Sequence, residues 1–477
     1  MRLEGYFEID QPQSLVWQKI TDHSLMAGCI PGCENINRVN DNTYDASIAI
    51  AVGIIKARFD VTVEVIKEIE PSEVHSRTTG QEGTRASLLA SDNFLKLSAV
   101  SENKTRVDYI SDVSVSGRLG KYGLGMMQKY TNKIADEFVS NFRRAIDPKG
   151  TTRPLIPSNA PGSSLWRKFL SLVQSWFGET DNRTNPTTET NNRKFFLPSS
   201  LKEAIQLLAA QQERVIISGG ATLVAMLNAN LIKPKSLVSL KNIHEIKGIR
   251  QNEDGSISIG AFSRHTETAN SELLTGSLSG VRDAASKIAN PTVRNMGTMG
   301  GSLAFADPAA DYAPALVAAD AEVELASSLG NRRIKASDFF VDWYQTALNP
   351  GEIIVAVHLP ATDPNAVGLH EKFARVEGDY ATVSVNIILS MDGKLCKYVR
   401  FAIGACGPVP VRSSEVEESF VGKPITESSL LDAGQILSAA CDPIDDVRGS
   451  AAYRLDLVPG LLLTAAEKAQ IQLSGNH

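Results

Sequence analysis

The chain has 477 residues, of which 43% are hydrophobic and 21% charged, and its 48 basic and 54 acidic residues give a formal net charge of −6. This length exceeds one ordinary domain, and the composition excludes wholesale disorder. The slight acidity excludes the dense positive field that nucleic-acid binding requires, so no nucleic-acid partner is expected. The five cysteines are few and odd in number, and the first residues lack the apolar core of a signal peptide, so we expect a cytoplasmic protein.

The first part of the chain, residues 1–147, has the patterns of an antiparallel sheet followed by a helix. Apolar and polar residues alternate from Phe59 to Val65, as in strands that have one face in a core and one in water. Between 121 and 146 the apolar residues recur at helical spacing, and this pattern stops before Pro148. We therefore predict an α+β domain over residues 1–147.

A flexible linker is predicted over residues 148–192, because this stretch is rich in proline and polar residues. One segment within it, residues 165–177, differs, since its apolar residues come in pairs at the spacing of one broad helical face. A helix of this length, at about 1.5 Å per residue, is too short to cross a bilayer. Two alternatives stay open, a helix that lies in a membrane interface and a helix that packs on protein.

The second half alternates strands with helices, which predicts a further mixed α+β fold. We expect a unit of two subdomains over residues 193–362. A polar, proline-containing turn near residues 360–365 predicts a boundary. A smaller α+β domain, which ends in a helix, is therefore expected over residues 363–477.

A glycine-rich loop follows the strand predicted at residues 215–217. It reads Ser218-Gly219-Gly220-Ala221-Thr222 and leads into a helical stretch. Backbone amides close on a phosphate only where side chains are absent, and a helix N-terminus adds positive charge. Alone, however, such a loop is more often a plain tight turn, and neither the Rossmann nor the P-loop spacing is present.

A second glycine cluster changes this balance. It reads Thr298-Met299-Gly300-Gly301-Ser302 and is followed by Ala306-Asp307-Pro308-Ala309-Ala310-Asp311-Tyr312. Two separate glycine loops, each beside a hydroxyl residue, are typical of a diphosphate held from two sides, while Asp311 is suited to accept hydrogen bonds from sugar or ribityl hydroxyls. Together the loops favour a dinucleotide site over two plain turns.

With these motifs, residues from about 193 to the end resemble the FAD-binding medium subunit of the molybdenum hydroxylases, the family of carbon monoxide dehydrogenase and xanthine dehydrogenase. The resemblance implies an FAD-binding domain over 193–362 and a flavoprotein C-terminal domain over 363–477. It implies noncovalent FAD and no catalytic or metal-binding residue in this chain, with His265 an ordinary polar residue. The FAD-binding residues that it implies are Ser218, Gly219, Gly220, Ala221, Thr222, Thr298, Met299, Gly300, Gly301, Ser302, Asp311, Lys372 and Tyr380, the last of these near the flavin ring.

In that family the FAD subunit does not contact the substrate. A molybdopterin centre in a large subunit passes electrons to [2Fe–2S] clusters in a small subunit. From these clusters the electrons reach the flavin one at a time, and they leave it in pairs. The cysteines of this chain do not have the clustered spacing that an iron–sulfur cluster requires. The resemblance therefore implies that the molybdopterin and the clusters lie on partner subunits.

Residues 1–147 resemble a second family, the G-subunit family of carbon monoxide dehydrogenase, which belongs to the helix-grip (START-like) superfamily. The motifs are Ile30-Pro31-Gly32-Cys33-Glu34, Val52 to Phe59 and Val113 to Gly120. This resemblance implies an antiparallel sheet around a long helix, with either a cavity for a quinone or lipid or a filled core with a docking role. It also implies association with the cytoplasmic membrane, which would make residues 165–177 a peripheral contact at its inner face.

We therefore expect a natural fusion of a G-subunit-like domain with an FAD subunit that passes electrons to an external acceptor such as quinone. Two alternatives stay open. One is a self-sufficient FAD oxidase, and the other is a non-catalytic recruitment or assembly scaffold.

Overall fold

The structure is a computed structural model and describes residues 2–52, 55–82, 87–117, 137–146, 193–210, 214–229, 231–232 and 234–475. The chain divides into two compact units, of which the second consists chiefly of Lys194–His477. The helix predicted at residues 165–177 lies outside the described residues. Both units mix helices with sheets, so the predicted α+β class is confirmed.

The N-terminal unit is built on one seven-stranded sheet of order β1-β7-β6-β5-β4-β3-β2. The strands are β1 (Arg2–Ile9), β2 (Cys33–Arg38), β3 (Thr43–Val52), β4 (Ile55–Ile69), β5 (Glu73–Glu82), β6 (Ser87–Ser101) and β7 (Lys104–Gly117). Two helices, α1 (Gln13–Ile20) and α2 (His23–Cys29), follow β1. Phe59 and Val61 are buried, whereas Asp60 between them is exposed, as their alternation predicts.

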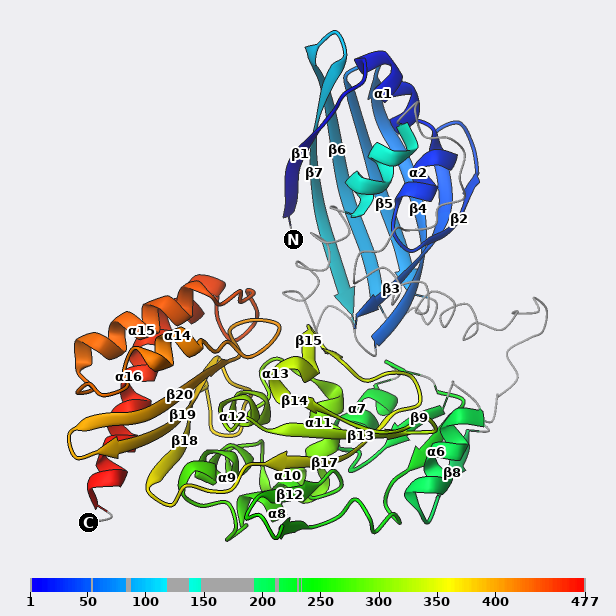
Figure 1. The fold of residues 1–477 in the computed structure, drawn as a ribbon. Coiled ribbons are helices and arrows are strands. Elements are labelled where there is room, and N and C mark those ends of the chain that lie inside the picture. The colour runs from blue at the N-terminus through cyan, green and yellow to red at the C-terminus, as the bar shows by residue number, and fades with distance from the viewer. Residues whose placement is uncertain are drawn as a thin grey trace. The chain divides into compact units, whose positions relative to one another are not determined.

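Helices cover one face of this sheet (Figure 1). Residues 137–146 are helical. The rings of Phe138 and Phe142 in this helix pack on the ring of Phe7 in β1, with centroids 6.4 and 6.3 Å from that of Phe7, respectively. Phe142 and Val107 of β7 are fully buried in the same cluster. The apolar stripe predicted for this helix therefore faces the sheet over the part that the structure describes.

The C-terminal unit begins with a small parallel sheet of order β8-β10-β9. Its strands are β8 (Lys194–Phe196), β9 (Arg214–Ile217) and β10 (Ser236–Ser239), and its helices are α6 (Leu201–Ala210) and α7 (Ala221–Asn228). Parallel neighbours require crossover connections, which the helices provide. This arrangement places the start of α7 immediately after the carboxyl end of β9.

An antiparallel five-stranded sheet of order β11-β12-β17-β13-β14 forms the middle of the unit. Its strands are β11 (Ile249–Gln251), β12 (Ile257–Gly260), β13 (Glu322–Ser327), β14 (Gly330–Lys335) and β17 (Ile353–Leu359). The connecting helices are α8 (His265–Ala269), α9 (Ser279–Ser286), α10 (Pro291–Met296), α11 (Met299–Phe305), α12 (Tyr312–Ala318) and α13 (Ala336–Phe339), and a short hairpin joins β15 (Phe340–Asp342) to β16 (Gln345–Thr346).

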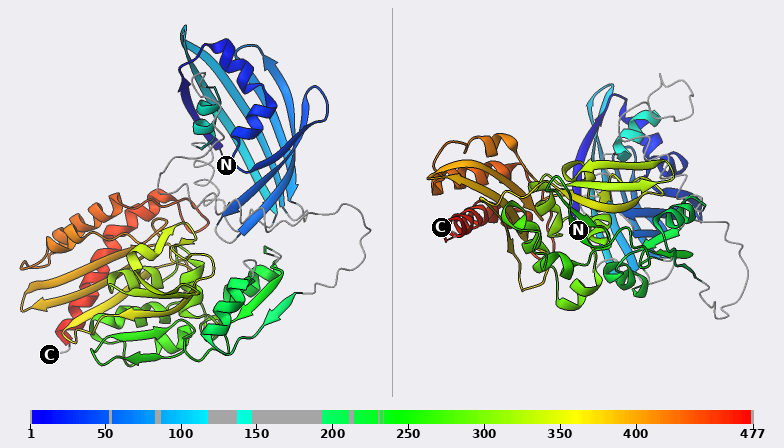
Figure 2. Two further views of the ribbon diagram at one scale, coloured as in Figure 1. Left: turned by 45° about the vertical axis from the view of Figure 1, so that its right-hand side comes forward. Right: turned by 60° about the horizontal axis from the view of Figure 1, so that its bottom comes forward.

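The chain ends in a three-stranded antiparallel sheet with helices. Strands β18 (Ala366–Phe373), β19 (Val383–Asp392) and β20 (Leu395–Gly404) are followed by α14 (Ser414–Glu418), α15 (Glu427–Ala439) and the long α16 (Ala451–Gly475). Figure 2 shows this sheet and the small parallel sheet at opposite ends of the C-terminal unit.

One apolar core joins the middle of this unit to its C-terminal part. Helix α12 is buried along its whole length and packs on β19 and β20. Ile388 of β19 and Ala402 of β20 belong to the same buried cluster as Val323 of β13 and Val357 of β17. Residues on both sides of the predicted boundary near 360–365 therefore share a core.

Candidate functional site

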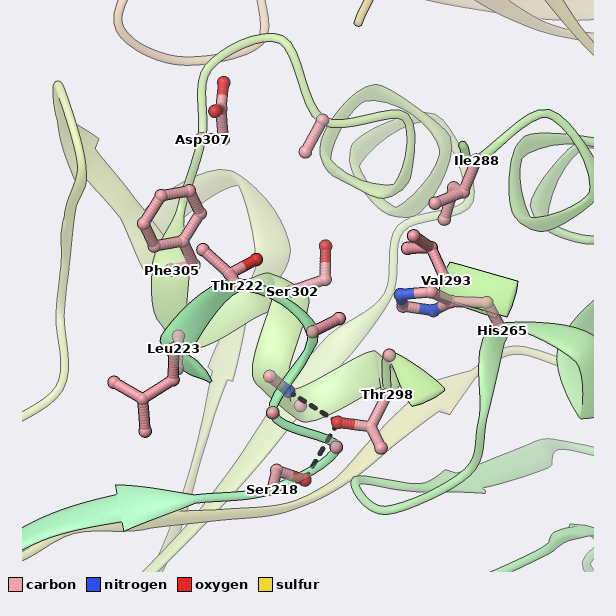
Figure 3. Close-up of a pocket in the computed structure, with 18 of the residues that line it drawn as sticks. Ser218, Thr222, Leu223, His265, Ile288, Val293, Thr298, Ser302, Phe305 and Asp307 are labelled. Atoms are coloured by element: carbon pink, nitrogen blue, oxygen red, sulfur yellow. Dashed lines mark hydrogen bonds between the residues drawn. The ribbon is translucent and has the colours of Figure 1, made fainter. Parts of the chain in front are cut away.

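The two glycine loops predicted from the sequence meet in the C-terminal unit. The hydroxyls of Ser218 and Thr298 are 2.8 Å apart and hydrogen-bonded, and Thr298 Oγ1 also accepts a hydrogen bond from the Gly301 amide (Figure 3). A Cβ atom on Gly219 would lie 1.8 Å from the carbonyl oxygen of Met296. The loops approach this closely because residue 219 has no side chain.

The start of α7 lies beside these loops. Its N-cap, Gly220, is in the left-handed conformation and has no side chain to cap the helix. The first amides of a helix have no partner within the helix, and here no capping side chain provides one. Helix α11 differs, because the side chain of its N-cap Thr298 accepts a hydrogen bond from the amide of Gly301 in the first turn. The start of α7 is therefore the better anion-binding end.

A cavity of about 440 Å³ extends from the loops. Both loops line it, including Thr222 and Ser302 with their hydroxyl groups, and Leu223, Ile288, Val293 and Phe305 are among its apolar walls (Figure 3). Asp311, Lys372 and Tyr380 line it as well. A mostly apolar pocket with a few polar groups is typical of a cofactor site.

Met299 is the exception among the predicted residues, since it does not line the cavity. Its side chain is fully buried in the apolar core, and its amide donates to the carbonyl oxygen of Ser263 at 2.9 Å. Met299 therefore anchors the second loop to the core and does not face the cavity.

Asp311 and Lys372 form a buried ion pair in the cavity wall. Lys372 Nζ lies 2.9 Å from Asp311 Oδ2, and His370 Nε2 lies 3.0 Å from Asp311 Oδ1. Lys372 also donates to the carbonyl oxygen of Lys287. The pair links α12 to β18, so each partner holds the other in a fixed position. Breaking such a buried pair by removing one partner costs about 3–5 kcal/mol.

His265, which the sequence predicts to be an ordinary polar residue, is buried and lines the cavity. Its Nδ1 lies 3.2 Å from the hydroxyl of Tyr312, and a Cβ atom on Gly297 would lie 2.4 Å from its Nε2. Burial, with a smaller contribution from Arg294 and against that of Asp311, lowers the pKa of His265 to about 4. The imidazole is therefore neutral at physiological pH.

Asp307 is a cavity residue that the sequence reasoning did not assign. Its Oδ1 accepts from the amide of Ala309, and its Oδ2 accepts from the hydroxyl of Tyr344 at 3.2 Å. Burial raises the pKa of Asp307. The position of Asp307 next to the second glycine cluster could have marked it as a cavity residue. Its hydrogen-bond partner Tyr344 could not be found in this way, because no local pattern connects the β15–β16 hairpin to that cluster.

Tyr380 lies at the partly exposed side of the cavity, with 40% of its surface accessible. The guanidinium carbon of Arg448 stands 5.3 Å from the centre of its ring. The loop before it is held by the ion pair between Arg375 and Asp379 at 2.9 Å. Two separate stretches of the chain, the loop 375–380 and Arg448, therefore meet at Tyr380.

Known families match most of the C-terminal unit. The FAD binding domain in molybdopterin dehydrogenase matches residues 189–362, and the CO dehydrogenase flavoprotein C-terminal domain matches residues 369–469. The glyceraldehyde dehydrogenase medium chain of Sulfolobus acidocaldarius is 30% identical over 56% of this chain and 94% of its own length. The carbon monoxide dehydrogenase medium chain of Afipia carboxidovorans is 31% identical over 57% of this chain and 95% of its own. The chain belongs to the FAD-binding medium-subunit family of the molybdenum hydroxylases.

The fold agrees with this family. A chain of quinoline 2-oxidoreductase from Pseudomonas putida 86 has 32% identity and a TM-score of 0.56, over 61% of this chain and 99% of that chain. A chain of the Cu,Mo-CO dehydrogenase has 30% identity and the same TM-score, over 58% and 98%. The medium-subunit part therefore spans nearly the full length of these relatives.

Residues 1–188 lie outside the two family matches of the medium subunit. Residues 5–147 match the G-subunit (CoxG) family of carbon monoxide dehydrogenase. This confirms the predicted fusion of a CoxG domain with a medium subunit. Among the described residues, no helix is both long and apolar enough to cross a bilayer.

Proposed function

We propose that this medium subunit holds FAD noncovalently in the 440 Å³ cavity, with the diphosphate between Ser218–Thr222 and Thr298–Ser302. The observation that carries the proposal is the contact of these two loops beside the uncapped start of α7. Oriented amides without competing side chains bind anionic groups. When bound, FAD supplies the conversion between one-electron and two-electron transfer.

The other cavity residues have separate roles in this proposal. The hydroxyls of Thr222 and Ser302 donate to the diphosphate, and the paired Asp311 and Lys372 bind the polar chain of the cofactor. Tyr380 lies beside the ring. The neutral His265 and the apolar walls exclude water without adding a charge near the anionic groups.

The partners in this proposal are a small subunit that carries [2Fe–2S] clusters and a large subunit that carries molybdopterin. The names of the relatives, which are medium chains or subunits of dehydrogenase complexes, support it. These relatives are named for glyceraldehyde, 6-hydroxypseudooxynicotine and carbon monoxide, yet all are 30–32% identical to this chain. The likeness of the medium subunit therefore does not assign the substrate of the complex.

The absorption spectrum of the purified full chain tests this function. We expect a yellow protein whose flavin is bleached only when the iron–sulfur and molybdenum partners and their substrate are added. A colourless chain that takes up no added FAD would support the scaffold alternative. Bleaching by an organic substrate without partners would support a self-sufficient oxidase.

The fused CoxG domain leads to a second proposal, that residues 1–147 and 165–177 keep the flavin unit at the cytoplasmic face of a membrane, where quinone accepts its electrons. The family match of residues 5–147 and the paired apolar residues of 165–177 support it. A tether of this kind raises the local concentration of the attached unit to about millimolar.

Two deletions of equal length test the membrane contact. Removal of residues 165–177 is expected to reduce flotation with phospholipid vesicles and to leave the flavin content unchanged. Removal of the polar residues 179–191 is the matched control, since it shortens the linker equally. Undiminished flotation of the first variant would contradict the membrane contact and leave the FAD proposal intact.

A further inference from the structure

Two cysteine thiols lie next to each other in the C-terminal part of the chain, outside the flavin cavity. Cys406 follows the end of β20, and Cys441 follows the end of α15. The amide of Asp442, the residue after Cys441, donates to the carbonyl oxygen of Cys406 at 2.9 Å, which places the two cysteines side by side. The thiol of Cys441 donates to the carbonyl oxygen of Leu437 at 3.2 Å, and the thiol of Cys406 donates to that of Arg454 at 3.9 Å.

The two thiols differ in their access to solvent. Cys406 is 1% exposed and belongs to the apolar cluster beneath α15 and α16, whereas Cys441 is partly exposed at the edge of that cluster. The neighbouring Cys441 thiol, followed by burial, raises the pKa of Cys406. Because the Cys406 sulfur is buried, a peroxide in solution does not reach it directly. A reagent in solution therefore meets Cys441 first.

We propose that Cys406 and Cys441 are a redox-active pair that a peroxide converts to a disulfide, with Cys441 as the attacking thiol. In the first step the sulfur of Cys441 attacks hydrogen peroxide, the O–O bond breaks, and a sulfenic acid and one water form. In the second step the sulfur of Cys406 attacks the Cys441 sulfur, the S–O bond breaks, and the disulfide and a second water form. The two thiols are oxidised by two electrons, and the peroxide takes up these electrons with the two thiol protons.

The position of the pair connects it to the cavity wall. Ala405, the residue before Cys406, donates its amide to the carbonyl oxygen of Pro308 at 3.2 Å, and its own carbonyl oxygen accepts from Arg454. Pro308 follows the cavity residue Asp307. The disulfide would therefore fasten the end of α15 to the loop that supports this wall. This inference does not depend on the proposed flavin function.

Peptide mapping of the full chain after treatment with hydrogen peroxide tests the proposal. Trypsin cuts after Arg400, Arg412 and Arg448, so the two cysteines fall in separate peptides, 401–412 and 413–448. We expect these peptides to be joined under non-reducing conditions, with the loss of two hydrogens and of both alkylatable thiols. A chain in which both thiols remain alkylatable, or in which Cys441 pairs equally with Cys29, Cys33 or Cys396, would overturn the proposal.

Two variants establish the order of reaction. In Cys406→Ser a sulfenic acid is expected to persist at Cys441 and to be trapped by dimedone, because the resolving thiol is missing. In Cys441→Ser the Cys406 thiol is expected to stay reduced. Cys396→Ser, which removes another buried thiol of the same cluster, is the control and should form the 406–441 cross-link as the unmodified chain does. If Cys406 in the Cys441→Ser variant were oxidised as fast as in the unmodified chain, Cys441 would not be the thiol that reacts first with peroxide.

Discussion

The hydroxyl groups of Ser218 and Thr298, which lie 80 positions apart in the chain, share a hydrogen bond of 2.8 Å. Through this contact the loop after β9 and the loop before α11 hold each other in place. The chain itself thus fixes the two loops that line the cavity, and loops held in place reduce the ordering that binding requires.

A double-mutant cycle on this contact is the first prediction. Ser218→Ala should lower the stability of the C-terminal unit by about 1 kcal/mol, the usual net value of one such bond. Thr298→Ala should cost more, because it also removes the cap of α11. Thermal unfolding and FAD titration of both single variants and the double variant measure the coupling. Strictly additive effects would mean that the two loops do not support each other.

Substitution of Gly219 by alanine is expected to abolish FAD retention. The new Cβ atom would lie 1.8 Å from the carbonyl oxygen of Met296, which forces the two loops apart. Gly460→Ala is a matched control, because Gly460 lies within α16 with open space around it, where alanine should stabilise the helix slightly. The measurement is the flavin-to-protein ratio after gel filtration, and normal loading of Gly219→Ala would contradict the proposed diphosphate site.

Removal of one member of the buried ion pair forms the third prediction. Lys372→Met leaves Asp311 in the cavity wall without its cation and should lower the free energy of unfolding by about 3–5 kcal/mol. The double variant Asp311→Asn/Lys372→Met removes both charges and should recover part of this loss. Chemical unfolding of the three proteins measures it. A double variant less stable than Lys372→Met would show that the charge left behind is not the cause.

The pH dependence of stability is expected to report on His265. The unfolded chain takes up a proton at this residue near pH 6.5, whereas the folded chain takes it up only near pH 4. Stability contributed by the neutral side chain is therefore present above pH 6.5 and is lost as the pH falls through this window. The loss amounts to about 3 kcal/mol, since one pKa unit corresponds to about 1.4 kcal/mol.

The matched variants for this test are His265→Asn and His244→Asn. The second residue is exposed, so its replacement should leave the pH profile of thermal unfolding unchanged. The first should flatten the profile between pH 6.5 and 4. Identical slopes for the unmodified chain and His265→Asn would contradict the buried, neutral state of this histidine.

The sequence predicted the local parts of the site better than its long-range contacts. The strand, glycine loop and helix around Gly219 and Gly220 follow directly from residue order, because glycine and the apolar run act over a few positions. The alternation of strands with helices in the second half and the helix that ends the last domain also agree with the sequence. Local chemistry of this kind is visible without the fold.

Contacts between distant segments could not be predicted in the same way. Nothing near Asp311 indicates that His370 and Lys372 occupy both of its carboxylate oxygens, since this depends on how α12 packs on β18. The surroundings of Gly300 could not be predicted from the sequence either. A Cβ atom on Gly300 would lie 2.7 Å from that of Ala261, so a larger residue would strain the core beneath the loop as well as the cavity. The predicted FAD contacts and domain boundaries stay predictions.

The burial of α12 on every side has a consequence for any attempt to divide the C-terminal unit. A fragment that stops at Pro360 would lose β19 and β20. The apolar side of α12 that these strands cover would then be exposed to water and prone to association. The FAD-binding domain is therefore expected to aggregate when it is expressed without the C-terminal domain. A fusion to another protein would have to include both domains.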